Sequence, residues 1–235
     1  MAVRPTLILV AGLLLTAGFW RRQVAALADR VDCRATDAHW RHDDLSAIAR
    51  AILAEAPPRF ALAGLSMGGY VCFEILRQAA DRVERLALLD TQAGPDTAEV
   101  AARRRGLIQL AGTGRFLGVT DRLLPLLGQP DRLAEPSLTN EIKEMAQSVG
   151  REGFLRQQKT IMARPDSRPD LARIDCPTLL LCGRQDALTP LSAHEEMQAG
   201  IAGSRLVVVD DCGHLPPLER PQETTAALRR WLSAD

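Results

Sequence analysis

One stretch in the first third of the chain restricts the possible folds more than any other. Residues 60–65 are apolar, and the sequence Gly-Leu-Ser-Met-Gly-Gly at positions 64–69 leads from them into a segment typical of a helix. In a Gly-x-Ser-x-Gly pattern, the serine lies on a strained strand-to-helix turn, so the residues two positions before and after it must lack bulk. Gly64 and Gly68 meet this requirement. The pattern predicts a nucleophile elbow, with the Ser66 hydroxyl exposed at the carboxyl end of a buried strand beside the first N–H groups of a helix.

Apolar runs alternate with helical patterns over most of the chain. Continuous apolar runs are typical of strands that are buried on both faces. Strands are predicted at residues 6–10, 33–36, 60–65, 85–90, 177–182 and 205–210, and helices at 20–29, 45–54, 70–79, 192–199 and 222–232. Residues 39–44 are interpreted as a polar connection. The alternation predicts an α/β fold, a mostly parallel sheet with helices on both faces.

The alternation stops between residues 94 and 173. This part has no convincing strand pattern, and helices are predicted at residues 99–110, 115–127, 139–149 and 151–162. We expect a helical lid, inserted after the strand that ends at Asp90 and placed above the carboxyl edge of the sheet. Residues 1–93 and 174–235 would form the core, and residues 94–173 the lid, of a single domain.

The composition is that of an ordinary globular protein. Hydrophobic residues make up 46% and charged residues 25% of the 235 residues, and 29 basic residues balance 29 acidic ones. Net charge therefore gives no reason to expect a nucleic acid or an anionic membrane as a partner. The five cysteines are an odd set without a Cys-x-x-Cys pair, which favours reduced thiols in a cytoplasmic protein over a disulfide framework or a metal site.

The N-terminal segment imitates a secretory signal. Arg4 precedes an apolar stretch at residues 7–15, and small residues follow. The stretch is too short to span a membrane. Residues 6–10 also make a good strand, and the loop after it is needed for the site predicted below. We therefore expect this segment to remain part of the fold.

A serine hydroxyl attacks a carbonyl group at neutral pH only when a general base takes its proton and a third group orients that base. The chain has four histidines. His39 and His42 lie in the polar connection, and His194 lies on a helix expected at the surface. His214 follows the last predicted strand, at the same sheet edge as Ser66, and is the predicted base.

Two acids could orient this base. Asp186 follows the strand at 177–182 after a short loop, and Asp90 ends the preceding strand. Both preserve the chain order serine, acid, histidine. Asp186 is favoured because the chain reaches His214 one strand–helix–strand unit later, and Asp90 is the alternative.

An oxyanion hole requires two N–H donors. The backbone N–H of Met67, directly after the serine, is one predicted donor, and that of Leu13, in the loop after the first strand, is the other. Cys212 lies next to His214 in sequence but lacks the elbow pattern, so we interpret it as a packing residue.

These motifs together resemble those of the α/β-hydrolase superfamily over nearly the whole chain. The resemblance implies a lidded, esterase-like serine hydrolase with a Ser66-His214-Asp186 triad, an acyl-enzyme intermediate, no cofactor, and a small or medium carboxylic ester as substrate. Thioesterases, amidases, carbon–carbon hydrolases and some lyases use the same triad, and such a scaffold can also bind ligands without catalysis. The motifs are Gly12-Leu13, the elbow at 64–69, Gly183-x-x-Asp186 and Gly213-His214-x-x-x-x-Glu219-x-Pro221.

Two features depart from the family pattern. Ala11 stands where family members commonly carry a histidine before Gly12, so one supporting side chain is missing and the loop is expected to be held differently. Only five residues precede Thr6, so we expect the usual N-terminal edge strands to be absent and the sheet to be shortened at that edge.

Overall fold

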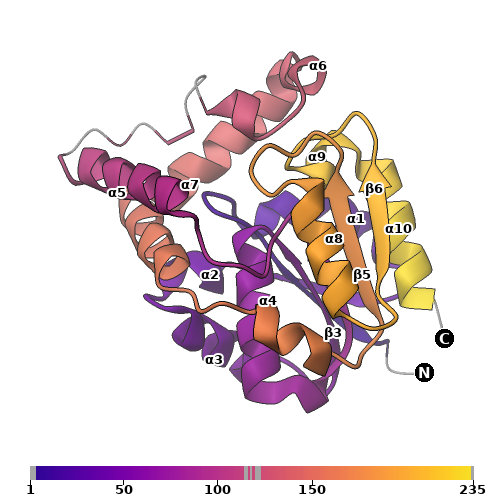
Figure 1. Ribbon diagram of the computed structural model, residues 1–235. Helices are drawn as coiled ribbons and strands as arrows, with labels where there is room; N and C mark the ends of the chain where they lie inside the picture. Colours follow the sequence, from indigo (N-terminus) through magenta and orange to yellow (C-terminus); the bar gives the residue numbers. More distant parts are fainter. Residues whose placement is uncertain (1–3, 114–115, 117, 120–122, 234–235) are drawn as a thin grey trace.

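Six parallel strands form one sheet in the order β2-β1-β3-β4-β5-β6. The structure is a computed structural model that describes residues 4–113, 116, 118–119 and 123–233. Figure 1 shows the sheet and the helices around it. The mostly parallel fold predicted from the sequence is confirmed, and β2 is the outermost described strand on its side. The strands are β1 (Thr6–Val10), β2 (Asp32–Thr36), β3 (Phe60–Leu65), β4 (Val83–Leu89), β5 (Thr178–Gly183) and β6 (Arg205–Val209).

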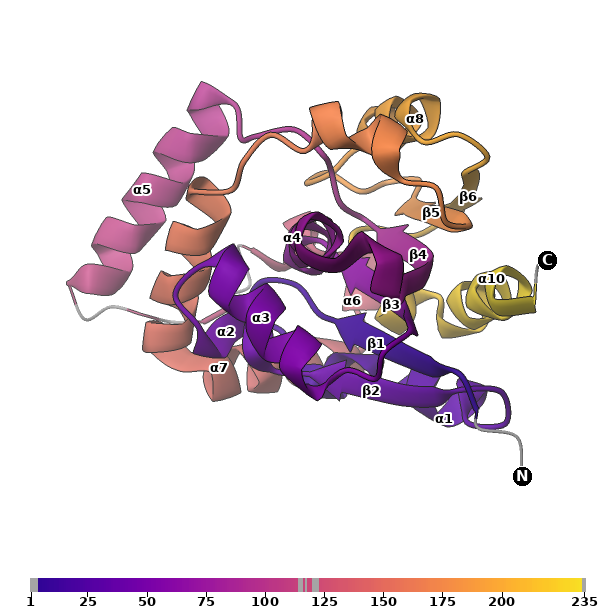
Figure 2. The same ribbon diagram turned by 90° about the horizontal axis from the view of Figure 1, so that it is seen from below.

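The side chains of the sheet alternate between two apolar clusters, one on each face. Leu7 and Leu9 of β1 enter the cluster that α1 and α10 cover, whereas Ile8 and Val10 enter the cluster that α3, α4 and α8 cover. Figure 2 shows helices on both sides of the sheet. Burial on both faces explains the continuous apolar runs, because neither face of a central strand meets water. These helices are α1 (Arg21–Leu27), α3 (Leu45–Glu55), α4 (Met67–Ala79), α8 (Leu191–Gly200) and α10 (Pro221–Ser233).

Short helices fill several connections between these elements. One of them, α2 (Ala38–Arg41), replaces part of the polar connection that we expected at 39–44. Local hydrogen bonds close this turn: the Ala38 N–H donates to Thr36 Oγ1 over 3.1 Å, and Trp40 Nε1–H donates to Asp37 Oδ1 over 3.1 Å. The others are η1 (Ala17–Trp20), η2 (Ala80–Arg82), η4 (Arg168–Arg173) and α9 (Pro216–Glu219).

Most of the described residues between positions 98 and 162, which separate β4 from β5, lie in helices, and we call this stretch the α5–α7 segment. It contains α5 (Ala98–Gly112), η3 (Leu124–Leu126), α6 (Pro130–Leu133) and α7 (Pro136–Met162). The helices expected at 139–149 and 151–162 are the two halves of α7, which breaks at Gly150 with φ 66° and ψ −177°. Much of the helix expected at 115–127 lies outside the described residues, and residues 124–126 form a single 3₁₀ turn.

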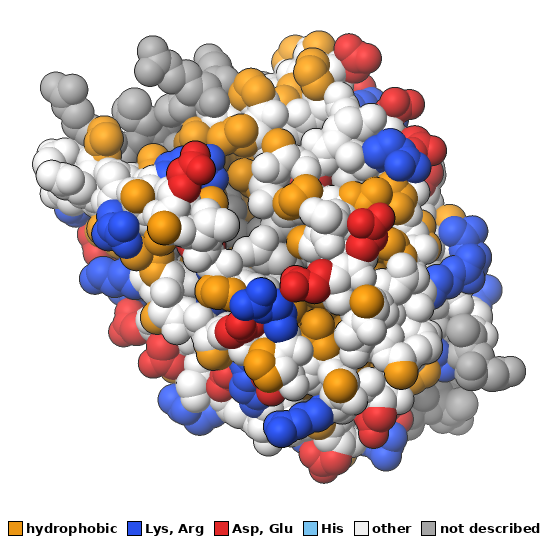
Figure 3. All heavy atoms as spheres, in the orientation of Figure 1, with side chains coloured by type: hydrophobic (Ala, Val, Ile, Leu, Met, Phe, Trp, Pro, Cys, Tyr) orange, Lys and Arg blue, Asp and Glu red, His pale blue; other side chains and the backbone are white. Residues whose placement is uncertain are grey.

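The described surface mixes both signs of charge. On the face in Figure 3, basic and acidic side chains are interspersed among apolar ones. In the parts of the chain that the structure describes, no helix has the length and apolar character that crossing a bilayer requires.

Candidate active site

Ser66 occupies a strained backbone position between β3 and α4. Its φ of 54° and ψ of −117° lie outside the regions that non-glycine residues favour. The two glycines of the motif permit this turn: a Cβ atom at Gly64 would lie 2.3 Å from the Gly68 carbonyl oxygen, and one at Gly68 would lie 2.2 Å from the Val10 carbonyl oxygen. The Ser66 side chain makes no capping hydrogen bond to α4. Its hydroxyl is therefore available for chemistry.

A buried network holds the backbone of the elbow. The Ser66 N–H donates to the Leu89 carbonyl over 2.9 Å, and the Thr91 hydroxyl donates to the Ser66 carbonyl over 2.8 Å. The Thr91 N–H in turn donates to His194 Nε2 over 3.2 Å. We expected His194 at the surface, but this was wrong: its side chain is completely buried, and burial lowers its pKa to about 4, which keeps the imidazole neutral and able to accept.

Asp186 and His214 form a buried pair on the loops that follow β5 and β6. His214 Nδ1 lies 2.8 Å from Asp186 Oδ2, and both side chains are at most 4% exposed. The same carboxylate oxygen accepts the Thr189 hydroxyl over 2.6 Å. The other oxygen accepts the backbone N–H groups of Leu188 and Thr189 over 2.8 and 3.2 Å. The structure thus brings together the histidine and the favoured acid of the sequence analysis.

The loops that carry these two residues are bound tightly to each other. A Cβ atom at Gly183 would lie 1.9 Å from the Gly213 carbonyl oxygen, so only glycine allows this approach. The Gln185 N–H donates to the Cys212 carbonyl over 2.9 Å. Glu219, almost fully buried, accepts the N–H groups of Gly213 and Leu215, which flank His214. The acid and the histidine are consequently held in register by backbone contacts.

Asp186 is ionised and oriented. Burial by itself would raise its pKa, but the positive charge of a protonated His214 and the hydrogen bonds from His214, Thr189 and Leu188 outweigh burial and hold the pKa at about 2. A carboxylate that keeps its charge at neutral pH favours the tautomer in which His214 Nδ1 carries the proton and Nε2 the lone pair.

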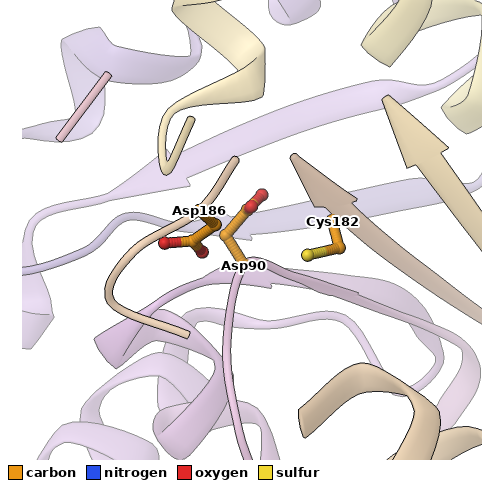
Figure 4. Close-up of side chains that lie close together, drawn as sticks. All are labelled: Asp90, Cys182 and Asp186. Carbon is orange, nitrogen blue, oxygen red and sulfur yellow. The ribbon is translucent and has the colours of Figure 1, made fainter. Parts of the chain in front are cut away.

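Asp90 behaves differently from Asp186. It lies at the end of β4 with φ 41° and is fully buried. Its Oδ1 accepts the Gly183 N–H over 2.9 Å, and its Oδ2 has no hydrogen-bond partner among the described residues. Burial, reinforced by the negative charge of Asp186, raises its pKa well above the usual value, so its neutral form is favoured. Figure 4 shows Asp90 between Asp186 and Cys182. The alternative acid thus lies beside the pair, whereas Asp186 makes the hydrogen bond to the histidine.

Ligand atoms of Asp90, Cys182 and Asp186 lie within 4.8 Å of one another, a spacing that a metal ion could bridge. The donors do not suit one. Both oxygens of Asp186 already accept hydrogen bonds, and burial raises the pKa of the Cys182 thiol, which disfavours the thiolate that metals bind. Burial also raises the pKa of the Cys212 thiol, in accordance with a packing residue.

Four groups that the sequence analysis assigned to the reaction make no hydrogen bond in the described part of the chain. Among the hydrogen bonds of the described residues, none uses the Ser66 hydroxyl, His214 Nε2, or the backbone N–H groups of Leu13 and Met67. The hydroxyl and Nε2 are also not among the fully buried unpaired atoms. Catalytic hydrogen bonds are often long or poorly aligned in enzymes without substrate. Among the described residues, the predicted nucleophile and the predicted base are thus not hydrogen-bonded to each other, and neither predicted oxyanion donor has an acceptor.

Two buried polar side chains near this site were not found from the sequence. Gln157 of α7 and His39 of α2 are both completely buried, and both bond to the loop after β1. Gln157 does have a signal in the sequence, because it lies three residues after Phe154 and four before Ile161 on the buried face of α7. A glutamine at an apolar helix position indicates a buried polar partner.

Comparisons with known proteins agree with this architecture. The model of the alpha/beta hydrolase family matches residues 7–228. A pimeloyl-[acyl-carrier protein] methyl ester esterase from Nitrosomonas europaea is 26% identical over 93% of this chain and 92% of that protein. A protein of the same name from Neisseria meningitidis is 30% identical over 80% of this chain and 75% of that protein.

Solved structures extend the likeness to three dimensions. A thermophilic esterase from Thermogutta terrifontis has a TM-score of 0.87 and 30% identity, covering 98% of this chain and 90% of that chain. The enol-lactonase from Burkholderia xenovorans has a TM-score of 0.88 and 25% identity, covering 98% of this chain and 92% of that chain. The family match spans nearly the whole described fold, and the chain is an enzyme of the α/β-hydrolase family.

Proposed function

We propose that this enzyme is a carboxylesterase in which Ser66 is the nucleophile, His214 the general base and Asp186 the residue that orients it. The observation that carries the proposal is the buried 2.8 Å contact between His214 Nδ1 and Asp186 Oδ2, at the sheet edge where the strained elbow exposes Ser66. The names of the related esterases and of the enol-lactonase support an ester as the substrate.

The chemistry follows from the proton positions. His214 Nδ1–H donates to Asp186, so Nε2 has a lone pair that takes the proton of the Ser66 hydroxyl as its oxygen attacks the ester carbon. The tetrahedral intermediate expels the alcohol, which receives this proton from Nε2, and an acyl-enzyme remains. Water then repeats the sequence against the acyl group and releases the carboxylic acid.

The negative charge on the former carbonyl oxygen needs donors that are already in place. The Met67 N–H begins α4, and the first N–H groups of a helix have no partner within the helix. We assign Met67 and Leu13 as the two oxyanion donors because neither N–H group has an acceptor among the described residues. Met67 directly follows Ser66, and Leu13 follows Gly12, where an added Cβ atom would lie 3.1 Å from Ser66 Cβ. Such donors contribute most when they need no reorientation during the reaction.

We also assign residues 94–173 as a lid over a core made of residues 1–93 and 174–235. The α5–α7 segment shares an apolar cluster with the α1–α10 face of the sheet. It also contacts the histidine loop directly: the His214 N–H donates to the Leu127 carbonyl over 3.1 Å, and the Gln129 N–H donates to Glu219 over 2.8 Å. A segment in this position would form one wall of the space that receives the acyl group of the substrate.

A fluorophosphonate probe and short-chain p-nitrophenyl esters test the proposal. We expect the probe to label Ser66 in the wild type, and Ser66→Ala to abolish labelling and to lower kcat by several orders of magnitude, on the order of 10⁶. Ser148→Ala, which removes an exposed hydroxyl on α7, is the matched control and should retain full activity. Turnover by Ser66→Ala within about tenfold of the wild type would refute the assignment, because removal of a nucleophile costs far more. A folded wild type that the probe does not label would indicate a ligand-binding protein instead.

A finer candidate substrate is an acyl methyl ester attached to an acyl-carrier protein. The names of the related esterases favour it, and Arg103 and Arg105 of α5 are exposed. Comparing kcat/KM for one methyl ester, free and attached to acyl-carrier protein, distinguishes the two. A preference for the carrier-bound ester that Arg103→Glu removes would support it, and equal kcat/KM values for the two esters would mean that the enzyme does not recognise the carrier.

A further inference from the structure

The loop after β1 carries the proposed oxyanion donor Leu13, yet it lacks the family's usual support. Ala11 occupies the position where a histidine commonly precedes Gly12, and its buried methyl group makes no hydrogen bond. Two side chains from distant parts of the chain hold the loop instead. His39 Nε2 lies 2.9 Å from the Leu15 carbonyl, which only a protonated Nε2 can contact favourably.

Gln157 is the second support, and it contacts the loop at two atoms. Its Oε1 accepts the Leu14 N–H over 3.0 Å, and its Nε2 lies 3.5 Å from the Gly12 carbonyl oxygen, a longer and weaker contact. A backbone N–H can only donate and a carbonyl oxygen can only accept, so the side-chain amide has a single favourable orientation. The side chain is completely buried, which strengthens this preference because water cannot replace either partner.

The loop needs such support because its backbone is strained. Leu14 has φ 61°, a left-handed conformation that is uncommon for a residue with a bulky side chain. The Leu15 N–H donates to the Gly12 carbonyl over 3.2 Å and closes a turn around Leu13 and Leu14. Gln157 takes the N–H of Leu14, and the N–H of Leu13 remains without an acceptor among the described residues.

We infer that Gln157 is a positioning residue for the oxyanion hole, which fixes the turn at Leu13 and Leu14 and so aims the Leu13 N–H at the substrate's carbonyl oxygen. This inference rests on the esterase function proposed above. Gln157 belongs to α7 and not to the sheet, so the helical segment contributes to the reaction rate as well as to the substrate pocket. Thr160, one turn further on, anchors this part of α7 through a 3.0 Å bond to the Asp43 carbonyl.

The test replaces Gln157 by methionine, which has a similar length but neither donor nor acceptor. We expect kcat for p-nitrophenyl butyrate to fall about 10- to 100-fold, because misplacing one oxyanion donor weakens the transition state more than the bound substrate. KM should change by less than about threefold for the same reason. The inhibition constant of butylboronic acid, whose Ser66 adduct imitates the tetrahedral intermediate, should rise by the same factor as kcat falls.

Gln158→Met is the matched control. Gln158 is the next residue of α7, equally buried, and its Oε1 accepts Arg104 Nη1–H over 2.9 Å, away from the loop after β1. This variant loses a buried amide from the same helix and should keep kcat and boronate affinity within about threefold of the wild type. Should Gln157→Met not fold, Gln157→Ala continues the helix and leaves space for water, and the same kcat loss is expected.

The outcomes separate this inference from the proposed function. A wild type that neither hydrolyses esters nor reacts with the fluorophosphonate probe overturns the esterase. If the wild type is active and the Gln157 variants have a kcat within about threefold of the wild-type value, the positioning role is overturned. Equal losses in the Gln157 and Gln158 variants overturn it as well, because they would indicate general loosening of α7.

Discussion

Replacing Asp186 by asparagine tests the contact between Asp186 and His214 on which the proposed active site depends. Two backbone N–H groups, of Leu188 and Thr189, donate to Oδ1, and only an oxygen can accept them. The new amide oxygen must therefore occupy the Oδ1 position, and the NH₂ group must replace Oδ2, which faces His214 Nδ1 at 2.8 Å. An NH₂ group donates to Nδ1, so the substitution forces the proton of His214 onto Nε2.

The size of the effect follows from that tautomer. With Nε2 protonated, His214 cannot take the proton of Ser66, and a wrong tautomer in a triad of this type lowers kcat by about 10⁴. This loss corresponds to about 5 kcal/mol in the activation free energy. The assay is hydrolysis of p-nitrophenyl butyrate at saturating substrate, with circular dichroism as the control for folding. KM should remain close to that of the wild type because Asp186 is buried beneath the histidine and meets no substrate.

Asp90→Asn is the matched control for this substitution. Asparagine keeps the oxygen that accepts the Gly183 N–H, and it tolerates the φ of 41° at this position. We expect kcat within about threefold of the wild type, because the neutral acid it replaces does not contact His214. If Asp90→Asn lost about 10⁴ in kcat while Asp186→Asn retained activity within about tenfold, the assignment of the acid would be reversed and the reasoning refuted.

The buried acid also predicts a pH dependence of stability. The pKa of Asp90 is raised in the folded state, so its favourable contribution to folding is present below about pH 3.8 and is lost as the pH rises through the folded-state pKa. Asparagine does not titrate. The free energy of unfolding of Asp90→Asn, measured by urea titration, should therefore increase relative to that of the wild type between about pH 4 and pH 8. A constant difference over that range would contradict the shift. Gly150→Ala should destabilise the protein by about 1–3 kcal/mol, because its backbone lies in a region nearly restricted to glycine. The control Gly106→Ala, in the open interior of α5, should stabilise it by up to about 1 kcal/mol, and melting temperatures that move in the same direction for both variants would exclude this explanation.

Much of the fold could be predicted because its signals are local. The apolar runs of β1, β3 and β5 have the length and continuity of strands that are buried on both faces of a sheet, and Gly64 and Gly68 mark the elbow. The acid and the histidine could be placed at the same sheet edge because parallel strands end on one side. These inferences required no knowledge of how distant side chains pack.

Two of the three features that the sequence did not reveal depend on contacts between distant residues. His194 is followed by two glutamates, which suggests an exposed position, yet its imidazole is buried and accepts the N–H of Thr91. Gln157 and the loop it holds are separated by 143 residues. The short helix at 38–41 depends on a threonine and an aspartate that could equally have favoured a loop. For His194 and Gln157 a tertiary hydrogen bond decides between alternatives that are locally equivalent, whereas local hydrogen bonds decide for the short helix.

The break at Gly150 has a practical consequence for building chimeras of this enzyme. Residues 151–162 carry Gln157 and the anchoring Thr160, whereas residues 98–149 lie before the break. Grafts from homologues that join at position 150 would exchange the helices of residues 98–149. They would keep this enzyme's own Gln157, which supports the loop after β1. Grafts that extend to position 162 would also replace Gln157, and should alter turnover together with selectivity.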